Sequence, residues 1–129
     1  MEAIKEIIKI EKPDILLIQE TKISDVEIMV LSRSWKNCHG KAISSRGTSR
    51  GITTLFSNKF SIKSMRESHH WLLIEIQEKD NSNPIYICNV YGPMHYKDKA
   101  FFWEELLKLH EDLQGKNLII VGDFNTTKL

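Results

Sequence analysis

Asn117-Leu118-Ile119-Ile120-Val121 is an apolar, strand-like run, and Gly122-Asp123-Phe124-Asn125 follows it directly. Because alternate residues of an extended chain point the same way, Asp123 and Asn125 are expected to share one face where a buried strand ends. The same pattern occurs earlier, where Asp14-Ile15-Leu16-Leu17-Ile18 leads into Gln19-Glu20-Thr21. Two apolar strands that each end in an acid predict a rim lined by carboxylates.

Apolar spacing divides the rest of the chain into helices and strands. Helical periodicity predicts one helix before Pro13, a second after the N-cap candidates Ser24 and Asp25, and a third over 97–114. Strands are expected at 14–19, 41–44, 51–56, 61–65, 71–76, 84–91 and from 117 onward. Local hairpins mixed with helical crossovers fit an α/β chain, with a mixed sheet covered by helices.

Length and composition indicate one ordinary globular domain. The chain has 129 residues, 18 basic and 17 acidic side chains and a formal charge of +1, which neither requires nor excludes a nucleic-acid partner. No apolar run approaches the roughly 18 residues that span a membrane, and the N-terminus lacks the layout of a signal peptide. With only Cys38 and Cys88, no disulfide framework is expected. These features predict an intracellular protein without a membrane partner, and they do not distinguish nucleus from cytoplasm.

Glu20 is the first candidate site residue. A carboxylate at a strand end is a good ligand for Mg²⁺, which takes one or two carboxylates and keeps several waters. The alternative is a solvated acid after a core strand, with Lys22 as its surface ion-pair partner.

The motif Asn89-Val90-Tyr91-Gly92-Pro93 is the second candidate. Asn89 and Tyr91 share one strand face, and a Tyr hydroxyl at a strand exit can donate to a phosphate oxygen. The alternative is an amphipathic Tyr at the edge of the core.

The third candidate pairs Asp123 with Asn125. Asp123 can accept a proton from an attacking water, while the amide of Asn125 can orient that water or hold a phosphate oxygen. Phe124 is expected to point back into the core. A kinase Asp-Phe-Gly motif is excluded, because Asn125 replaces the Gly and the chain has no Gly-rich phosphate loop or His-Arg-Asp motif.

The segment 44–51 is small, polar and basic, and it carries Arg46 and Arg50. It fits contact with a nucleic-acid backbone and a plain hairpin connection equally well.

Taken in order, these motifs resemble the endonuclease/exonuclease/phosphatase superfamily, the group of DNase I and the apurinic-site endonucleases. The likeness is strongest to the endonuclease domain of LINE-type non-LTR retrotransposons, and it rests especially on residues 12–21 and 122–126. It covers essentially the whole chain. The resemblance implies part of a four-layer α/β/β/α sandwich, with a mixed sheet and flanking helices.

The resemblance also implies roles for the candidate residues. Glu20 would bind Mg²⁺, or Mn²⁺ in its place, and Tyr91 would lie at the scissile phosphate. Asp123 would position or deprotonate the attacking water, and Asn125 would help to bind the phosphate. DNA would be the partner, and three further residues are expected to contact it: Arg46, Arg50 and Asn89.

The resemblance also implies parts of the domain that have no counterpart in residues 1–129. Family members begin with a strand that ends in an Asn near the metal, and they continue after Gly-Asp-x-Asn with a half-domain that ends in Ser-Asp-His. Residues 1–129 are therefore expected to be an incomplete domain, without the first strand and the C-terminal half. The absent half would carry the partner sheet, which predicts an exposed apolar sheet face or an unpaired edge open to self-association.

The expected function is Mg²⁺-dependent hydrolysis of phosphodiester bonds in DNA, impaired by the truncation. One alternative is a noncatalytic remnant that at most binds nucleic acid or self-associates. Another is an enzyme of the same superfamily that acts on phosphoinositides or sphingomyelin, against which the retrotransposon-like phrasing around Glu20 and Asp123 argues.

Overall fold

The computed structural model describes residues 1–44, 51–80 and 83–125. The helices and strands predicted from the sequence are present, with bounds shifted by a few residues. In chain order they are α1 (Glu2–Glu11), β1 (Ile15–Gln19), α2 (Asp25–Ser32), β2 (His39–Ser44), β3 (Gly51–Phe56), β4 (Phe60–Glu67), β5 (Trp71–Glu78), β6 (Ile85–Tyr91), α3 (Tyr96–Asp112) and β7 (Leu118–Asp123).

Local signals explain where the first two helices begin and end. Lys12 follows α1 in the left-handed conformation (φ 48°), and Pro13 comes next, so the helix cannot continue. Ser24 and Glu27 form a capping box at the start of α2, because the side chain of each accepts the backbone N–H of the other at 3.1 Å. Short connections on either side of β1 thus fix its position between two helices.

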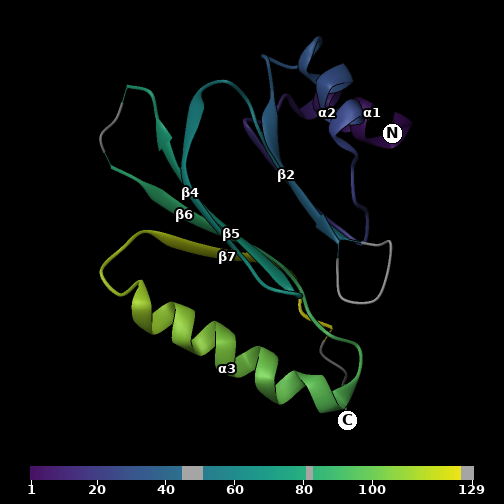
Figure 1. Ribbon diagram of the computed structural model, residues 1–129. Coiled ribbons are helices and arrows are strands. Elements are labelled where there is room, and N and C mark those ends of the chain that lie inside the picture. The colour runs from purple at the N-terminus through teal and green to yellow at the C-terminus, as the bar shows by residue number, and fades with distance from the viewer. Residues whose placement is uncertain (45–50, 81–82, 126–129) are drawn as a thin grey trace.

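The strands form two sheets (Figure 1). One sheet is antiparallel and has the order β1-β3-β2, and the other has the order β4-β5-β6-β7. Within the second sheet β6 and β7 run parallel, whereas its other neighbours are antiparallel. The prediction of a mixed sheet is therefore confirmed, and α3 is the crossover that makes β6 and β7 parallel.

Three hydrophobic clusters hold four layers together. The middle cluster joins the inner faces of the two sheets and includes Ile52, Phe56, Leu72 and Ile87. A second cluster packs α1 and α2 on the outside of the first sheet, and a third packs α3 on the outside of the second. The α/β/β/α sandwich is thus confirmed. The expectation that the partner sheet would be absent is wrong, because the chain divides its strands between both sheets.

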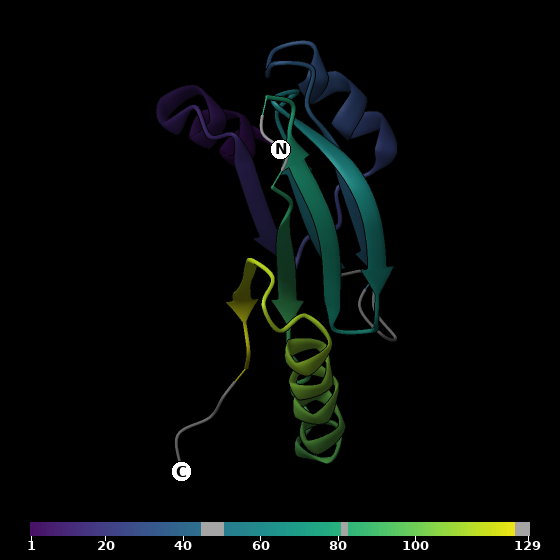
Figure 2. The same cartoon turned by 90° about the vertical axis from the view of Figure 1, so that its left-hand side faces the viewer.

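One side of the sandwich is formed by the edge strands β1 and β7, which contact each other across the two layers (Figure 2). Within the described residues neither strand has a neighbour on its outer edge. Ile119 and Val121 of β7 are 49% and 43% exposed, whereas Leu118 and Ile120 on its other face pack toward α3. This open side is an unpaired edge of the kind that favours association with another strand.

Both cysteines are core residues. Cys38 and Cys88 are buried free thiols, and burial raises the pKa of Cys88 to about 12. Neither is therefore a reactive thiolate in the folded chain. In the described parts of the chain, none of the helices combines the length and apolar character needed to cross a membrane.

Candidate active site

Three strands end at the same end of the sandwich and bring the predicted acids together. Figure 2 shows the arrowheads of β1, β6 and β7 pointing toward this end. Glu20 follows β1, Tyr91 is the last residue of β6, and Asp123 is the last residue of β7. Tyr91 and Asp123 are also direct partners in the parallel β6–β7 register. The predicted rim of carboxylates therefore exists, and Tyr91 lies within it.

Glu20 and Tyr91 are in direct contact although 71 positions separate them in the sequence. The Tyr91 hydroxyl donates to Glu20 Oε1 at 3.2 Å, and its ring is part of the cluster between the sheets. Glu20 has a positive φ of 67°, so the chain turns sharply as it leaves β1. The Glu20 side chain is exposed, and across the described residues no other hydrogen bond or ion pair reaches its carboxylate.

Asp123 and Asn125 form a tight turn after β7. The Asp123 carboxylate accepts the backbone N–H of Asn125 at 2.9 Å, and the Asn125 side-chain amide donates to the backbone oxygen of Gly92. A Cβ at Gly92 would lie 2.4 Å from the backbone oxygen of Phe124, so only glycine allows this approach. The turn therefore ties the end of β7 to the end of β6.

Phe124 points away from this turn and into the core, as predicted. Its ring stacks on Trp103 of α3, with centroids 5.7 Å apart and an interplanar angle of 6°. Because this packing anchors Phe124, the residues on either side of it project from the opposite face at the edge of the site.

Lys99 is a site residue that the sequence did not suggest. Its ammonium group donates to the backbone oxygen of Asn125 at 2.6 Å, which places a positive charge beside the Asp123 turn. Lys99 lies in the first turn of an amphipathic helix, where lysine is common, so only the folded chain shows its position.

The expectation that Asn89 contacts nucleic acid is wrong. Asn89 is 0% exposed, and its amide lies between the two sheets. Its Oδ1 accepts from Gln19 Nε2 at 2.7 Å, and its Nδ2 donates to the backbone oxygen of Thr53 at 3.0 Å and to Thr54 Oγ1 at 3.1 Å. Asn89 therefore links the end of β1 to the middle of β3 from a position on β6 two residues before Tyr91. The other two expected contacts, Arg46 and Arg50, lie outside the described residues.

The side chain of His70 contacts the backbone of Tyr91. Its Nδ1 lies 3.1 Å from the backbone oxygen of Tyr91, an acceptor, so this nitrogen carries the proton of the hydrogen bond. Burial lowers the pKa of His70, although the contact with Tyr91 opposes this shift. Burial, followed by the charge of Lys79, also lowers the pKa of His39 at the other end of the sandwich.

These two histidines predict a loss of stability in mild acid. The two imidazoles bind protons less readily in the folded chain than in the unfolded chain. Their contribution to the free energy of unfolding is therefore present above the unfolded pKa of about 6.5. It should decline as the pH falls from about 7 toward 5, because the unfolded state then takes up protons first. Urea unfolding across this range should show the decline, and a His39→Gln/His70→Asn variant should show a flatter dependence. An unchanged slope in that variant would contradict the assignment.

The possible metal ligands at this end are carboxylates at the strand ends. Nowhere in residues 1–44, 51–80 and 83–125 do three or more His, Cys, Asp or Glu side chains gather in a way that could hold a metal ion. The available donors are carboxylate oxygens, which suit a hard cation such as Mg²⁺ that keeps most of its waters. The donor chemistry of Glu20 thus fits a loosely held Mg²⁺.

A two-sheet sandwich with outer helices, and with Glu20, Tyr91 and Asp123 at one end, defines a DNase I-like hydrolase fold. The chain belongs to the endonuclease/exonuclease/phosphatase family, which it matches over residues 1–128. A comparison with curated proteins gave no match.

Solved structures share this fold at low sequence identity. The human Nocturnin catalytic domain superposes with a TM-score of 0.75 at 20% identity, covering 96% of this chain and 55% of that one. ANGEL2, a 2',3'-cyclic phosphatase, superposes with a TM-score of 0.77 at 20% sequence identity. The match covers 98% of this chain and 44% of ANGEL2. A family member from Bacteroides thetaiotaomicron superposes with a TM-score of 0.73 at 12% sequence identity. The match covers 95% of this chain and 53% of that one. The chain thus spans about half the length of the structures that it matches.

Proposed function

We propose that this chain hydrolyses phosphodiester bonds in DNA with the help of Mg²⁺, as a relative of the retrotransposon endonucleases. The observation that carries the proposal is the contact between Tyr91 and Glu20, with Asp123 aligned beside Tyr91 at the same end of the sandwich. Membership of the endonuclease/exonuclease/phosphatase family supports the same class of chemistry. The two buried free thiols agree with action inside the cell.

Each side chain has a role that its position allows. Asp123, an exposed acceptor, orients and deprotonates the attacking water. The Tyr91 hydroxyl, which now donates to Glu20, donates to a phosphate oxygen when DNA is bound. Asn125 helps to hold the phosphate. Glu20 holds Mg²⁺, which supplies positive charge to the phosphate oxygens when it is bound.

The activity should be slow and should need millimolar Mg²⁺. A single carboxylate with water ligands binds Mg²⁺ weakly, and no larger cluster of ligands occurs among the residues that the structure describes. Mn²⁺ should replace Mg²⁺, because it accepts the same oxygen ligands.

A plasmid-nicking assay tests the proposal. Supercoiled DNA should be converted slowly to the open circle in Mg²⁺ or Mn²⁺, and EDTA should stop the conversion. Circular dichroism and a cooperative thermal transition would establish that the sample is folded. A folded sample that leaves the plasmid intact in both metals would refute the proposal.

The alternative is a noncatalytic protein that self-associates. The observation that favours it is the open side of the sandwich, where β1 and β7 are edge strands and Ile119 and Val121 are exposed. In this case the folded sample would leave DNA intact and its mass, measured by light scattering, would rise with concentration. The nicking assay and the mass therefore separate the two functions.

A further inference from the structure

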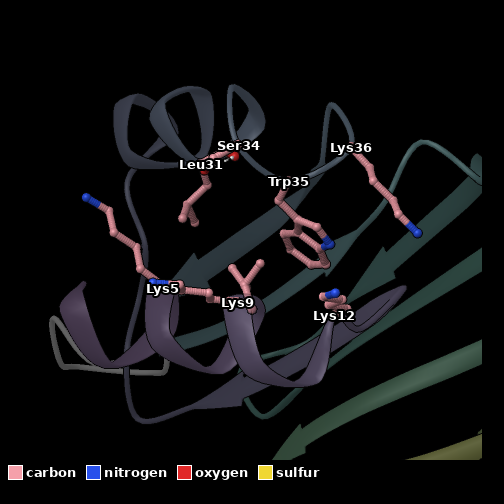
Figure 3. A pocket seen from close by; sticks show the side chains of 8 residues that line it. Lys5, Lys9, Lys12, Leu31, Ser34, Trp35 and Lys36 are labelled. Atoms are coloured by element: carbon pink, nitrogen blue, oxygen red, sulfur yellow. Dashed lines mark hydrogen bonds between the residues drawn. The ribbon is translucent and has the colours of Figure 1, made fainter.

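A second candidate site lies between α1 and α2, away from the carboxylate rim (Figure 3). The two helices and the segments that follow them border an open cavity of about 520 Å³. Small-molecule sites in proteins occupy roughly 300–1,000 Å³, so this volume suits a small ligand. Lys12 at its border precedes β1, whereas Glu20 follows β1, so the two sites lie toward opposite ends of that strand.

The floor of this cavity is apolar. It is made by Ile8 of α1, Leu31 of α2 and Trp35 in the segment after α2, which are 8%, 1% and 3% exposed. The indole N–H of Trp35 donates to the backbone oxygen of Pro13 at 2.9 Å, which fixes the ring in place. Figure 3 shows Leu31 of α2 and Trp35 of the following segment extending toward α1. The hydrogen-bonding need of the indole is met within the protein, so the small part of the ring that borders the cavity is carbon only.

The wall and mouth of the cavity carry four lysines and no acid. Lys5 and Lys9 come from α1, Lys12 from its end, and Lys36 from the segment after α2. Their methylene stems can extend the apolar wall while the ammonium groups reach water. Fixed positive charge therefore surrounds an apolar interior.

Little of this charge is neutralised by neighbouring acids. Lys5 lies 3.7 Å from Glu2, and Lys36 lies 3.4 Å from Asp14, but the side chains of both pairs are substantially exposed and such pairs are weak. Lys9 and Lys12 form no ion pair with any of the described residues. At least two ammonium groups are thus available to an incoming anion.

We propose that this cavity binds a single-chain anionic amphiphile, with its hydrocarbon tail on the apolar floor and a carboxylate or phosphate head at the lysines. A nucleic-acid backbone would satisfy the lysines and leave the floor uncovered. An anionic bilayer would need a broadly basic face, whereas the two helices and their flanks also carry several acids: Glu2, Glu6, Glu11, Asp25 and Glu27. A monomeric amphiphile uses both the apolar and the charged parts of the cavity.

The test uses decyl phosphate below its micelle concentration. Binding is followed by calorimetry and by the NMR signal of the Trp35 indole N–H, with decanol and inorganic phosphate as the tail-only and head-only probes. The test variant is Lys9→Glu/Lys12→Glu. The matched control is Lys63→Glu/Lys116→Glu, which makes the same change in net charge at exposed lysines outside the cavity.

Decyl phosphate should saturate one site and shift the Trp35 signal. Its affinity should fall about tenfold or more in the Lys9/Lys12 variant, and each partial probe should bind at least about tenfold more weakly than decyl phosphate. Equal binding of decanol or of inorganic phosphate would overturn the proposal, as would equal loss of affinity in the control variant. Binding only to anionic vesicles, or no binding at all, would also overturn it. Because the site is separate from Glu20, either result leaves the proposed hydrolysis untouched.

Discussion

Replacing Asn89 with alanine will lower the free energy of unfolding by about 3–4 kcal/mol, because the change leaves several buried polar groups without partners. The Asn89 amide is the shared partner of Gln19 Nε2, the Thr53 carbonyl and the Thr54 hydroxyl. Asn89 itself is 0% exposed, so water does not replace the lost bonds without opening the sandwich. The loss should be measured by urea unfolding.

The matched control for this change is Asn58→Ala. Asn58 is exposed in the turn between β3 and β4, so its replacement should change stability by less than about 0.5 kcal/mol. The NMR signals of Glu20 and Tyr91 should move in the Asn89 variant, since Asn89 lies beneath them and holds β1 against β6. A variant as stable as the control would show that the amide is not the link between the sheets.

The Asp123→Ala substitution will reduce plasmid nicking by about a hundredfold or more, as expected for loss of a group that transfers a proton in the transition state. The carboxylate is exposed at the end of β7, and its one described hydrogen bond is to the backbone N–H of Asn125. Loss of that bond should cost only about 1 kcal/mol of stability. The variant should therefore fold and fail to nick.

A second variant separates proton transfer from the shape of the turn. Asp123→Asn retains an oxygen that can accept the Asn125 N–H, but it cannot take a proton from water, so it should be as inactive as Asp123→Ala. Asp112→Ala, at the exposed end of α3, is the control and should nick at the unchanged rate. Full activity in Asp123→Asn would remove Asp123 from its proposed role.

The sequence predicted the rim of this site because strand ends are local features. Alternation along two apolar runs placed Glu20 and Asp123 at strand exits, and the order of the motifs placed Tyr91 with them. The contact between Tyr91 and Glu20 could not be predicted from spacing alone, since it depends on two sheets packing face to face. The family resemblance assigned both residues to one site, but it did not predict their direct contact.

Two expectations, the absent partner sheet and the nucleic-acid contact of Asn89, were wrong for the same physical reason. Both depend on how the strands are divided between the two sheets. Periodicity indicates that 51–56 and 71–76 are strands, but it does not indicate that β3 and β5 belong to different sheets. The sequence did not show that a second sheet covers the strand face shared by Asn89 and Tyr91. That face was therefore interpreted as an exposed surface that binds a ligand. In the folded chain both residues are buried, but the hydroxyl of Tyr91, at the end of β6, reaches Glu20 at the rim, whereas the amide of Asn89, two residues earlier, bonds only within the sandwich. Lys99 was missed because helix position alone does not show which lysine faces a site.

Binding of Mn²⁺, followed by paramagnetic broadening of backbone NMR signals, tests the central claim most directly. If Glu20 holds the divalent cation beside Tyr91 and Asp123, the signals of Thr21, Tyr91 and Asp123 should broaden first. Excess Mg²⁺ should restore them, and Glu20→Gln should largely abolish the effect. Broadening that persists in Glu20→Gln, or that centres on another carboxylate such as Asp14, would contradict the account.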